Sequence, residues 1–280
     1  MAALDIRPLT RWTGAEIVGP DLSEPVDDNL AESLRRALGD WQVIFFPDQH
    51  LDIAAQKRLT RVFGPLTRSP YVVPMADDPD VIAVLKEADE VNVGVFGGDW
   101  HSDFSFLKDP PLGSVLNAVE VPPWGGDTLW ANQVAALEAL PDTLRQAIEG
   151  RNVIHIGKPY GVSHAPPEEE RAGGSIRMVR NDPEADRETE HPAIRIDPVS
   201  GQFALNFNPT YAVRLSGMRE DESAPLLDAV HRHTTRPEFC CRFRWRAGCV
   251  AVWNNYTTMH YAVNDYDGHR RMLYRTTFGK

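Results

Sequence analysis

The stretch Trp100-His101-Ser102-Asp103-Phe104-Ser105-Phe106 places an imidazole and a carboxylate two residues apart among apolar neighbours. On an extended strand, the side chains at positions i and i+2 point to the same face of the sheet. His101 and Asp103 can therefore reach one point together. A nitrogen ligand beside an oxygen ligand suits a first-row transition metal. The stretch thus predicts a metal centre that needs a further ligand from elsewhere in the chain.

A second histidine is the ligand to look for. Two histidines and one carboxylate on one face of a metal form the facial triad of non-haem Fe(II) oxygenases. Of the nine histidines, most lie among charged, turn or helix residues, where a surface or core role is the simpler interpretation. His260 differs because it follows soon after the apolar segment 250–254. On spacing alone, His260 is only one candidate for the third ligand.

Two arginines follow His260 in the segment Arg271-Met272-Leu273-Tyr274-Arg275. On a strand, positions 271 and 275 share a face, so both guanidinium groups could enter one cavity. Buried arginine is rare unless it meets an anion, and its planar fork matches a carboxylate in bidentate fashion. This segment alone does not decide whether the two arginines bind an anion together or form surface salt bridges.

The composition limits the classes of function. The chain has 280 residues, 42% of them apolar, enough for a sizeable core. The net charge of −11, with no basic tract, argues against a nucleic-acid partner but allows an anionic small molecule in a locally basic pocket. The three cysteines lack metal-type spacing and are interpreted as reduced thiols. No signal peptide or bilayer-spanning run is visible, so we expect a cytoplasmic protein without a membrane partner.

Short strands alternate with a few helices along the chain. Hydrophobic patterns predict strands at 4–9, 15–18, 43–46, 81–85, 115–121, 241–245, 250–254 and 272–277, and a hairpin within 193–207. They predict helices at about 28–38, 54–63, 133–140, 141–149 and 222–234. The polar segment 158–190 is expected to be a long loop and, with 86–99, a candidate lid. The pattern favours a single mainly-β domain over residues 1–280, a β-sandwich or jelly roll with flanking helices.

Together, these motifs resemble one known family. The motifs are Trp100-His101-x-Asp103, then Gly125-Gly126-Asp127-Thr128-Leu129-Trp130, then His260-Tyr261-Ala262-Val263-Asn264-Asp265-Tyr266 with Arg270, Arg271 and Arg275 behind it. Their order is similar to that in the TauD/TfdA, or taurine dioxygenase, family of Fe(II)- and 2-oxoglutarate-dependent dioxygenases. The resemblance runs from about residue 5 to residue 278.

The resemblance carries expectations for fold, cofactors and reaction. It implies a double-stranded β-helix, which is a jelly-roll barrel, and a homo-oligomer. It implies Fe(II), 2-oxoglutarate and O2 as cofactor and cosubstrates, with C–H oxidation and release of succinate and CO2. By position, His101, Asp103 and His260 would bind the iron. Arg271 and Thr128 would bind the distal carboxylate of 2-oxoglutarate, and Arg275 would contact the anionic end of the substrate.

Two positions depart from the taurine-oxidising members. Ser69 stands where those members place a substrate-binding histidine, and the segment 96–99 has glycine where they carry an amide. Taurine is therefore disfavoured, and a larger anionic substrate contacting Ser69 is expected. Desaturation or cyclisation at the same site remain alternatives. A metal hydrolase and a 2-oxoglutarate-binding sensor are alternatives from other classes, disfavoured by the two arginines and by the complete triad.

Overall fold

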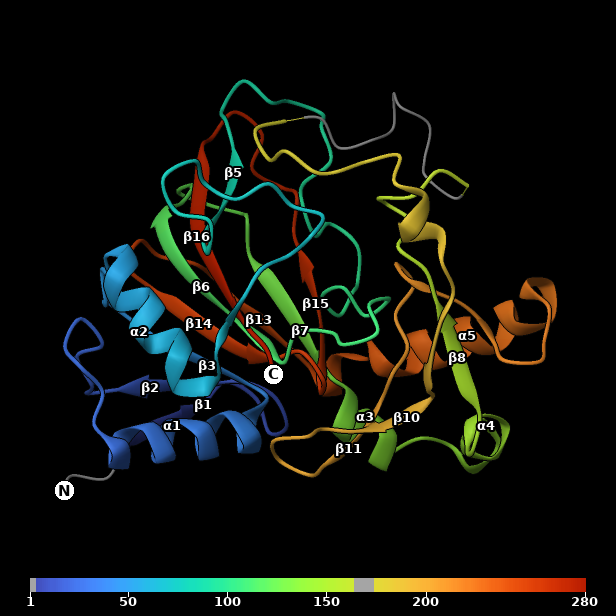
Figure 1. Ribbon diagram of the computed structural model, residues 1–280. Helices are drawn as coiled ribbons and strands as arrows, with labels where there is room; N and C mark the ends of the chain where they lie inside the picture. Colours follow the sequence, from blue (N-terminus) through green and yellow to red (C-terminus); the bar gives the residue numbers. More distant parts are fainter. Residues whose placement is uncertain (1–3, 164–173) are drawn as a thin grey trace.

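The computed structural model describes residues 4–163 and 174–280 and is mainly β with a few helices (Figure 1). Its largest sheet has eight strands in the order β1-β2-β3-β14-β6-β16-β4, with β5 also paired to β16. The bounds are β1 Asp5–Pro8, β2 Ala15–Val18, β3 Val43–Phe46, β4 Leu66–Thr67, β5 Ile82–Lys86, β6 Gly113–Glu120, β14 Val250–Asn254 and β16 Arg271–Phe278.

Three smaller sheets complete the β structure of the described residues. The orders are β13-β7-β15, β12-β8-β9 and β10-β11. Their bounds are β7 Thr128–Asn132, β13 Cys240–Phe243, β15 Thr258–Ala262, β8 Asn152–His155, β9 Thr189–Pro192, β12 Ala212–Leu215, β10 Ile194–Ile196 and β11 Phe203–Leu205. The hairpin expected within 193–207 is β10-β11, paired antiparallel.

Each of the five expected helices is present, with ends shifted by a few residues. The bounds are α1 Asp28–Trp41, α2 Ile53–Phe63, α3 Gln133–Glu138, α4 Asp142–Ile148 and α5 Glu220–Thr234. An aspartate caps the N-terminus of each of the first two helices. The Asp27 carboxylate accepts a hydrogen bond from the Leu30 amide, and the Asp52 carboxylate accepts one from the Ala55 amide. Both helices lie against the large sheet, whereas α3, α4 and α5 gather with β8 to β12 on the other side of the molecule (Figure 1).

The strand β3 is apolar throughout, and β14 is apolar up to its last residue, Asn254, because the large sheet is covered on both faces. Along β3, Phe45 belongs to a core shared with the sheet β13-β7-β15, which contributes Trp130 and Phe243. The alternate residue Phe46 belongs to a second core that includes Leu59 of α2. A strand buried on both faces loses the polar alternation of a half-exposed strand. The molecule is therefore layered as helices, large sheet and small sheet.

The segment 158–190, expected to be a long loop, is only partly described. Residues 164–173 lie outside the described residues, and the remainder contains the short 3₁₀ helix Pro183–Asp186 and the start of β9. Met178 pairs with Val72 in an isolated β-bridge, which ties this segment to the loop after β4. Among the residues the structure describes, no helix has the length and hydropathy needed to cross a bilayer.

Candidate functional site

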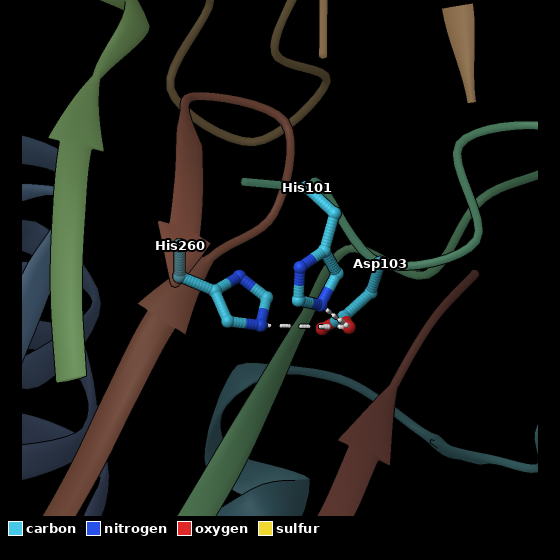
Figure 2. A group of neighbouring side chains, drawn as sticks. All are labelled: His101, Asp103 and His260. Carbon is cyan, nitrogen blue, oxygen red and sulfur yellow. Dashed lines mark ion pairs between the residues drawn. The ribbon is translucent and has the colours of Figure 1, made fainter. Parts of the chain in front are cut away.

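The two histidines meet through their backbones. The His101 amide donates to the His260 carbonyl at 3.0 Å, and the His260 amide donates to the His101 carbonyl at 2.8 Å. This isolated antiparallel bridge places both imidazoles on the same side, facing the carboxylate of Asp103 (Figure 2). Asp103 Oδ1 lies 3.5 Å from His101 Nε2 and 3.6 Å from His260 Nε2. Two segments far apart in the sequence thus bring the three donor atoms together.

The spacing of these donors suits a shared cation. One ligand atom from each residue lies within 4.8 Å of the other two, and all three residues are buried. Two donor atoms that each bind a metal at about 2.1 Å lie at most about 4.2 Å apart. The two distances from Asp103 Oδ1 to the histidine Nε2 atoms, 3.5 and 3.6 Å, meet that limit.

The geometry that brings His101 and Asp103 together is not the extended strand that the sequence predicted. Only His101 is paired as a strand residue, and the chain turns from Asp103 through Phe106. Phe104 has a φ of +47°, in the left-handed region that non-glycine residues rarely adopt. The expectation of an i, i+2 strand pair was therefore wrong, although the two side chains do converge.

Asn255 holds this turn in place. Its Oδ1 accepts from the Asp103 amide at 2.6 Å, and its Nδ2 donates to the carbonyls of Asp103 at 2.9 Å and Pro111 at 3.0 Å. The Arg195 guanidinium in turn donates to the Asn255 carbonyl at 2.8 Å. Sequence reasoning assigned Asn255 no role. The signal available was a pair of asparagines, Asn254-Asn255, at the end of an otherwise apolar strand.

Replacing Asn255 by alanine is expected to loosen the Asp103 turn. Removing a partner that orients a metal ligand typically lowers metal affinity about 10- to 100-fold. Loss of buried hydrogen bonds should also lower the free energy of unfolding by about 2–3 kcal/mol. Competition with a chelator would measure Fe(II) affinity, and denaturant unfolding would measure stability. Asn29→Ala, an exposed position on α1, is the control. Unchanged Fe(II) affinity in Asn255→Ala would contradict the assignment.

A buried arginine sets the charge of the carboxylate. Burial would raise the pKa of Asp103, but the Arg275 guanidinium and the two imidazoles outweigh it and hold that pKa well below its usual range. Arg275 Nη2 lies 2.7 Å from Asp103 Oδ2, and both side chains are almost fully buried. The carboxylate is therefore anionic, with Oδ1 directed at the histidines and Oδ2 at the arginine.

The His260 imidazole is prepared as a neutral ligand. Burial, together with the neighbouring His101, lowers the pKa of His260 well below its ordinary value. The Nδ1 atom of His101 lies 2.7 Å from the Asp99 carbonyl, which fixes the ring with Nε2 toward Asp103. Metal-binding histidines commonly donate their second ring N–H to a carbonyl in this way.

A small cavity of about 40 Å³ adjoins the histidines on one side. It is lined by His101, His260, Thr128, Arg271 and Arg275, so the two arginines of β16 do share a face and a cavity. Arg271 Nε donates to the Gly126 carbonyl at 3.1 Å, and Trp245 Nε1 donates to the Thr128 hydroxyl oxygen at 3.0 Å. Burial lowers the pKa of Arg271. A desolvated guanidinium beside a hydroxyl donor forms a receptor for a carboxylate.

A larger cavity of about 590 Å³ lies on another side of the same centre. Its lining includes His101, Asp103, Phe104, Tyr160 and Tyr211, together with the loop 94–99 and the basic residues Lys158 and Arg180. Phe104 and Phe106 are both buried members of the core, and Phe104 also lines this cavity. Ser69 lines a neighbouring cavity that shares Phe104.

Residues 5–277 match the family model described as the taurine catabolism dioxygenase TauD, TfdA family. The chain belongs to this family. TauD/TfdA proteins are 2-oxoglutarate-dependent dioxygenases, so the chain is an oxidoreductase, and the family uses Fe(II), 2-oxoglutarate and O2.

Relatives across the TauD/TfdA family match over nearly the whole chain. An alpha-ketoglutarate-dependent sulfate ester dioxygenase of Pseudomonas putida is 35% identical over 98% of this chain and 89% of its own length. An alkylsulfatase of Acinetobacter baylyi is 34% identical over 98% of this chain and 84% of its own. The solved structure of a taurine dioxygenase from Burkholderia xenovorans superposes with a TM-score of 0.80, at 31% identity, over 100% of this chain and 92% of that one.

Proposed function

We propose that this dioxygenase hydroxylates an aliphatic C–H bond of a small anionic substrate, with release of succinate and CO2. His101, Asp103 and His260 are the proposed iron ligands. The observation that carries the proposal is their convergence: three buried donor atoms from two distant segments, directed at one point. The ligand set, two imidazoles and one carboxylate, is that of the facial triad, which leaves positions for cosubstrate and O2.

The small cavity is the proposed site of the 2-oxoglutarate chain. Arg271 would take the distal carboxylate in bidentate fashion, and the Thr128 hydroxyl would donate to the same group. Support comes from their shared position on the lining of a cavity that His101 and His260 also reach. A dicarboxylate anchored there can extend its keto acid end toward the iron ligands.

The protein's own contribution is charge, orientation and exclusion of water. Arg275 keeps Asp103 anionic, Asn255 fixes the Asp103 turn, and the Asp99 carbonyl orients the His101 ring. Bound Fe(II) would supply the activation of O2 that couples decarboxylation of 2-oxoglutarate to attack on the substrate. Burial of all three ligands limits water at this point.

The large cavity is the proposed substrate site. The named activities of two relatives, on sulfate esters and as an alkylsulfatase, support an anionic substrate. The expected substrate contacts are Arg275 and Ser69. Ser69 lines the neighbouring cavity, and Arg275 lines the small cavity. The contacts of these two residues with a substrate in the large cavity therefore stay predictions. The single domain with a lid at 158–190, the jelly-roll barrel, the homo-oligomer and the cytoplasmic location likewise stay predictions.

A spectral titration tests the proposed metal and cosubstrate site. Adding 2-oxoglutarate anaerobically to the Fe(II)-loaded protein should produce a weak visible charge-transfer band, because the keto acid end chelates the metal. Succinate lacks the keto oxygen and is the control, with no band expected. A folded protein that gives no band with 2-oxoglutarate would favour the hydrolase or the sensor instead.

A further inference from the structure

We propose that Tyr266 is a positioning residue for Arg271, and that Lys86 holds Tyr266 in place for this task. The two residues set the direction of the guanidinium that receives the distal carboxylate of 2-oxoglutarate. This inference rests on the proposed function, because it takes Arg271 as the receptor of that carboxylate. The sequence prediction gave neither Lys86 nor Tyr266 a role.

The ring of Tyr266 contacts both cations. Arg271 Cζ lies 5.9 Å from the ring centroid, and Lys86 Nζ lies 4.8 Å from it. A cation within about 6 Å of an aromatic centroid is attracted by the quadrupole of the ring. Tyr266 is 2% exposed and Lys86 is 5% exposed, so water screens this attraction little. The ring therefore restrains the Arg271 side chain, whose Nε also donates to the Gly126 carbonyl at 3.1 Å.

The restraint on Arg271 carries no negative charge. Burial raises the pKa of Tyr266, so its phenol is neutral at physiological pH. Among the described residues, no carboxylate forms an ion pair with Arg271, whereas the adjacent Arg270 pairs with two glutamates. A carboxylate partner would compete with the incoming cosubstrate. An aromatic ring instead orients the guanidinium and leaves its charge available for a bidentate contact.

Lys86 anchors the loop that carries Tyr266. Its Nζ donates to Asn264 Oδ1 at 2.9 Å and to Asp267 Oδ1 at 2.5 Å, which lie on either side of Tyr266 in the chain. Lys86 is also the last residue of β5 and pairs directly with Arg271, the first residue of β16. Paired residues on neighbouring strands present their side chains on the same face of the sheet. The strand neighbour of the receptor thus holds the loop that supplies the ring.

Arg271 lies between these two residues and the proposed cosubstrate. Lys86, Tyr266 and Arg271 line one cavity of about 20 Å³. Arg271 also lines the small cavity, together with Thr128, whereas the described lining of that cavity includes neither Lys86 nor Tyr266. Both residues would therefore affect the binding of 2-oxoglutarate through Arg271, and not by touching the cosubstrate.

Two keto acids test whether the effect passes through the distal carboxylate. 2-Oxopentanoate has the carbon chain of 2-oxoglutarate but ends in a methyl group. Each acid is titrated anaerobically into the Fe(II)-loaded protein, with binding followed by the charge-transfer band and by calorimetry. Tyr266→Leu should weaken 2-oxoglutarate about tenfold, as expected when a buried cation–π contact is lost, and leave 2-oxopentanoate unchanged. Lys86→Met should weaken 2-oxoglutarate with the same selectivity.

A double-mutant cycle tests whether Tyr266 acts through Arg271. Arg271→Ala removes the receptor, so adding Tyr266→Leu to it should weaken 2-oxoglutarate no further. Tyr266→Phe keeps the ring and should retain most of the wild-type affinity. Additive losses in the double variant, or a loss in Tyr266→Phe as large as that in Tyr266→Leu, would overturn the role of the ring.

A tyrosine on the same strand is the matched control. Tyr274 lies on the opposite face of β16 from Arg271, and Tyr274→Leu should bind both keto acids as the wild type does. Affinity for Fe(II), measured by chelator competition, should be unchanged in the Lys86, Tyr266 and Tyr274 variants. Equal weakening of the two keto acids, or undiminished binding of 2-oxoglutarate in Tyr266→Leu when Arg271→Ala does weaken it, would refute the positioning role alone. A wild-type protein without the charge-transfer band would instead defeat the proposed function.

Discussion

Replacing His260 by alanine is expected to reduce succinate formation by about 1,000-fold or more, the scale lost when an essential group is removed. His260 supplies one of three donor atoms gathered at one point, and alanine leaves only His101 and Asp103. Two ligands hold Fe(II) far more weakly than three, so Fe(II) affinity should fall in parallel. Succinate production with 2-oxoglutarate, and chelator competition for the metal, are the two measurements.

The control is a histidine on a helix away from the centre. His231 lies on α5, and His231→Ala should keep wild-type Fe(II) affinity and succinate formation. Equal losses in the two variants would show a general effect on folding. A His260→Ala protein that still binds Fe(II) with wild-type affinity would remove His260 from the proposed ligand set.

Replacing Arg271 by alanine is expected to raise the 2-oxoglutarate concentration needed for half-maximal rate about 100-fold or more. A bidentate pair between a buried guanidinium and a carboxylate contains two charge-assisted hydrogen bonds, worth about 3 kcal/mol together, and about 1.4 kcal/mol corresponds to tenfold. The concentration of primary substrate needed for half-maximal rate should change far less. Initial rates of O2 uptake, with each component varied in turn, would measure the difference.

The adjacent arginine offers a matched control. Arg270 is only partly buried and forms ion pairs with Glu87 and Glu120. Arg270→Ala should therefore leave the 2-oxoglutarate requirement unchanged, apart from a small effect on stability. If Arg270→Ala raised that requirement as strongly as Arg271→Ala, the proposed carboxylate receptor would be wrong.

Local sequence predicts β3 and β14 well and the small sheet β12-β8-β9 poorly. The ranges 43–46 and 250–254 were predicted with the bounds observed for β3 and β14, because covering both faces leaves an apolar run, which in β14 ends at Asn254. The strands β8, β9 and β12 were missed. β9, for example, is Thr189–Pro192, a proline-containing segment of partly exposed residues without apolar alternation. Its strand conformation comes from pairing with β8, a long-range contact.

The site shows the same division between local and long-range causes. Residue types and spacing pointed to His101 and Asp103, whereas the resemblance to the family's motifs was needed to single out His260 among the nine histidines. The conformation that unites them could not be predicted locally. The Asp103 turn depends on Asn255, which lies 152 residues further along the chain. A resemblance to known motifs identifies ligands, whereas the residues that hold those ligands become visible only in three dimensions.

The backbone bridge between His101 and His260 has a consequence for biosynthesis. During translation, His101 and Asp103 are synthesised long before His260. Domains begin to fold as the chain emerges from the ribosome. An incomplete polypeptide carries His101 and Asp103 but lacks the partner segment that completes the bridge. Iron capture should therefore wait until translation has passed residue 260 and β15 has joined its sheet. With the proposed ligand set, a chain terminated before residue 260 would lack a complete iron site.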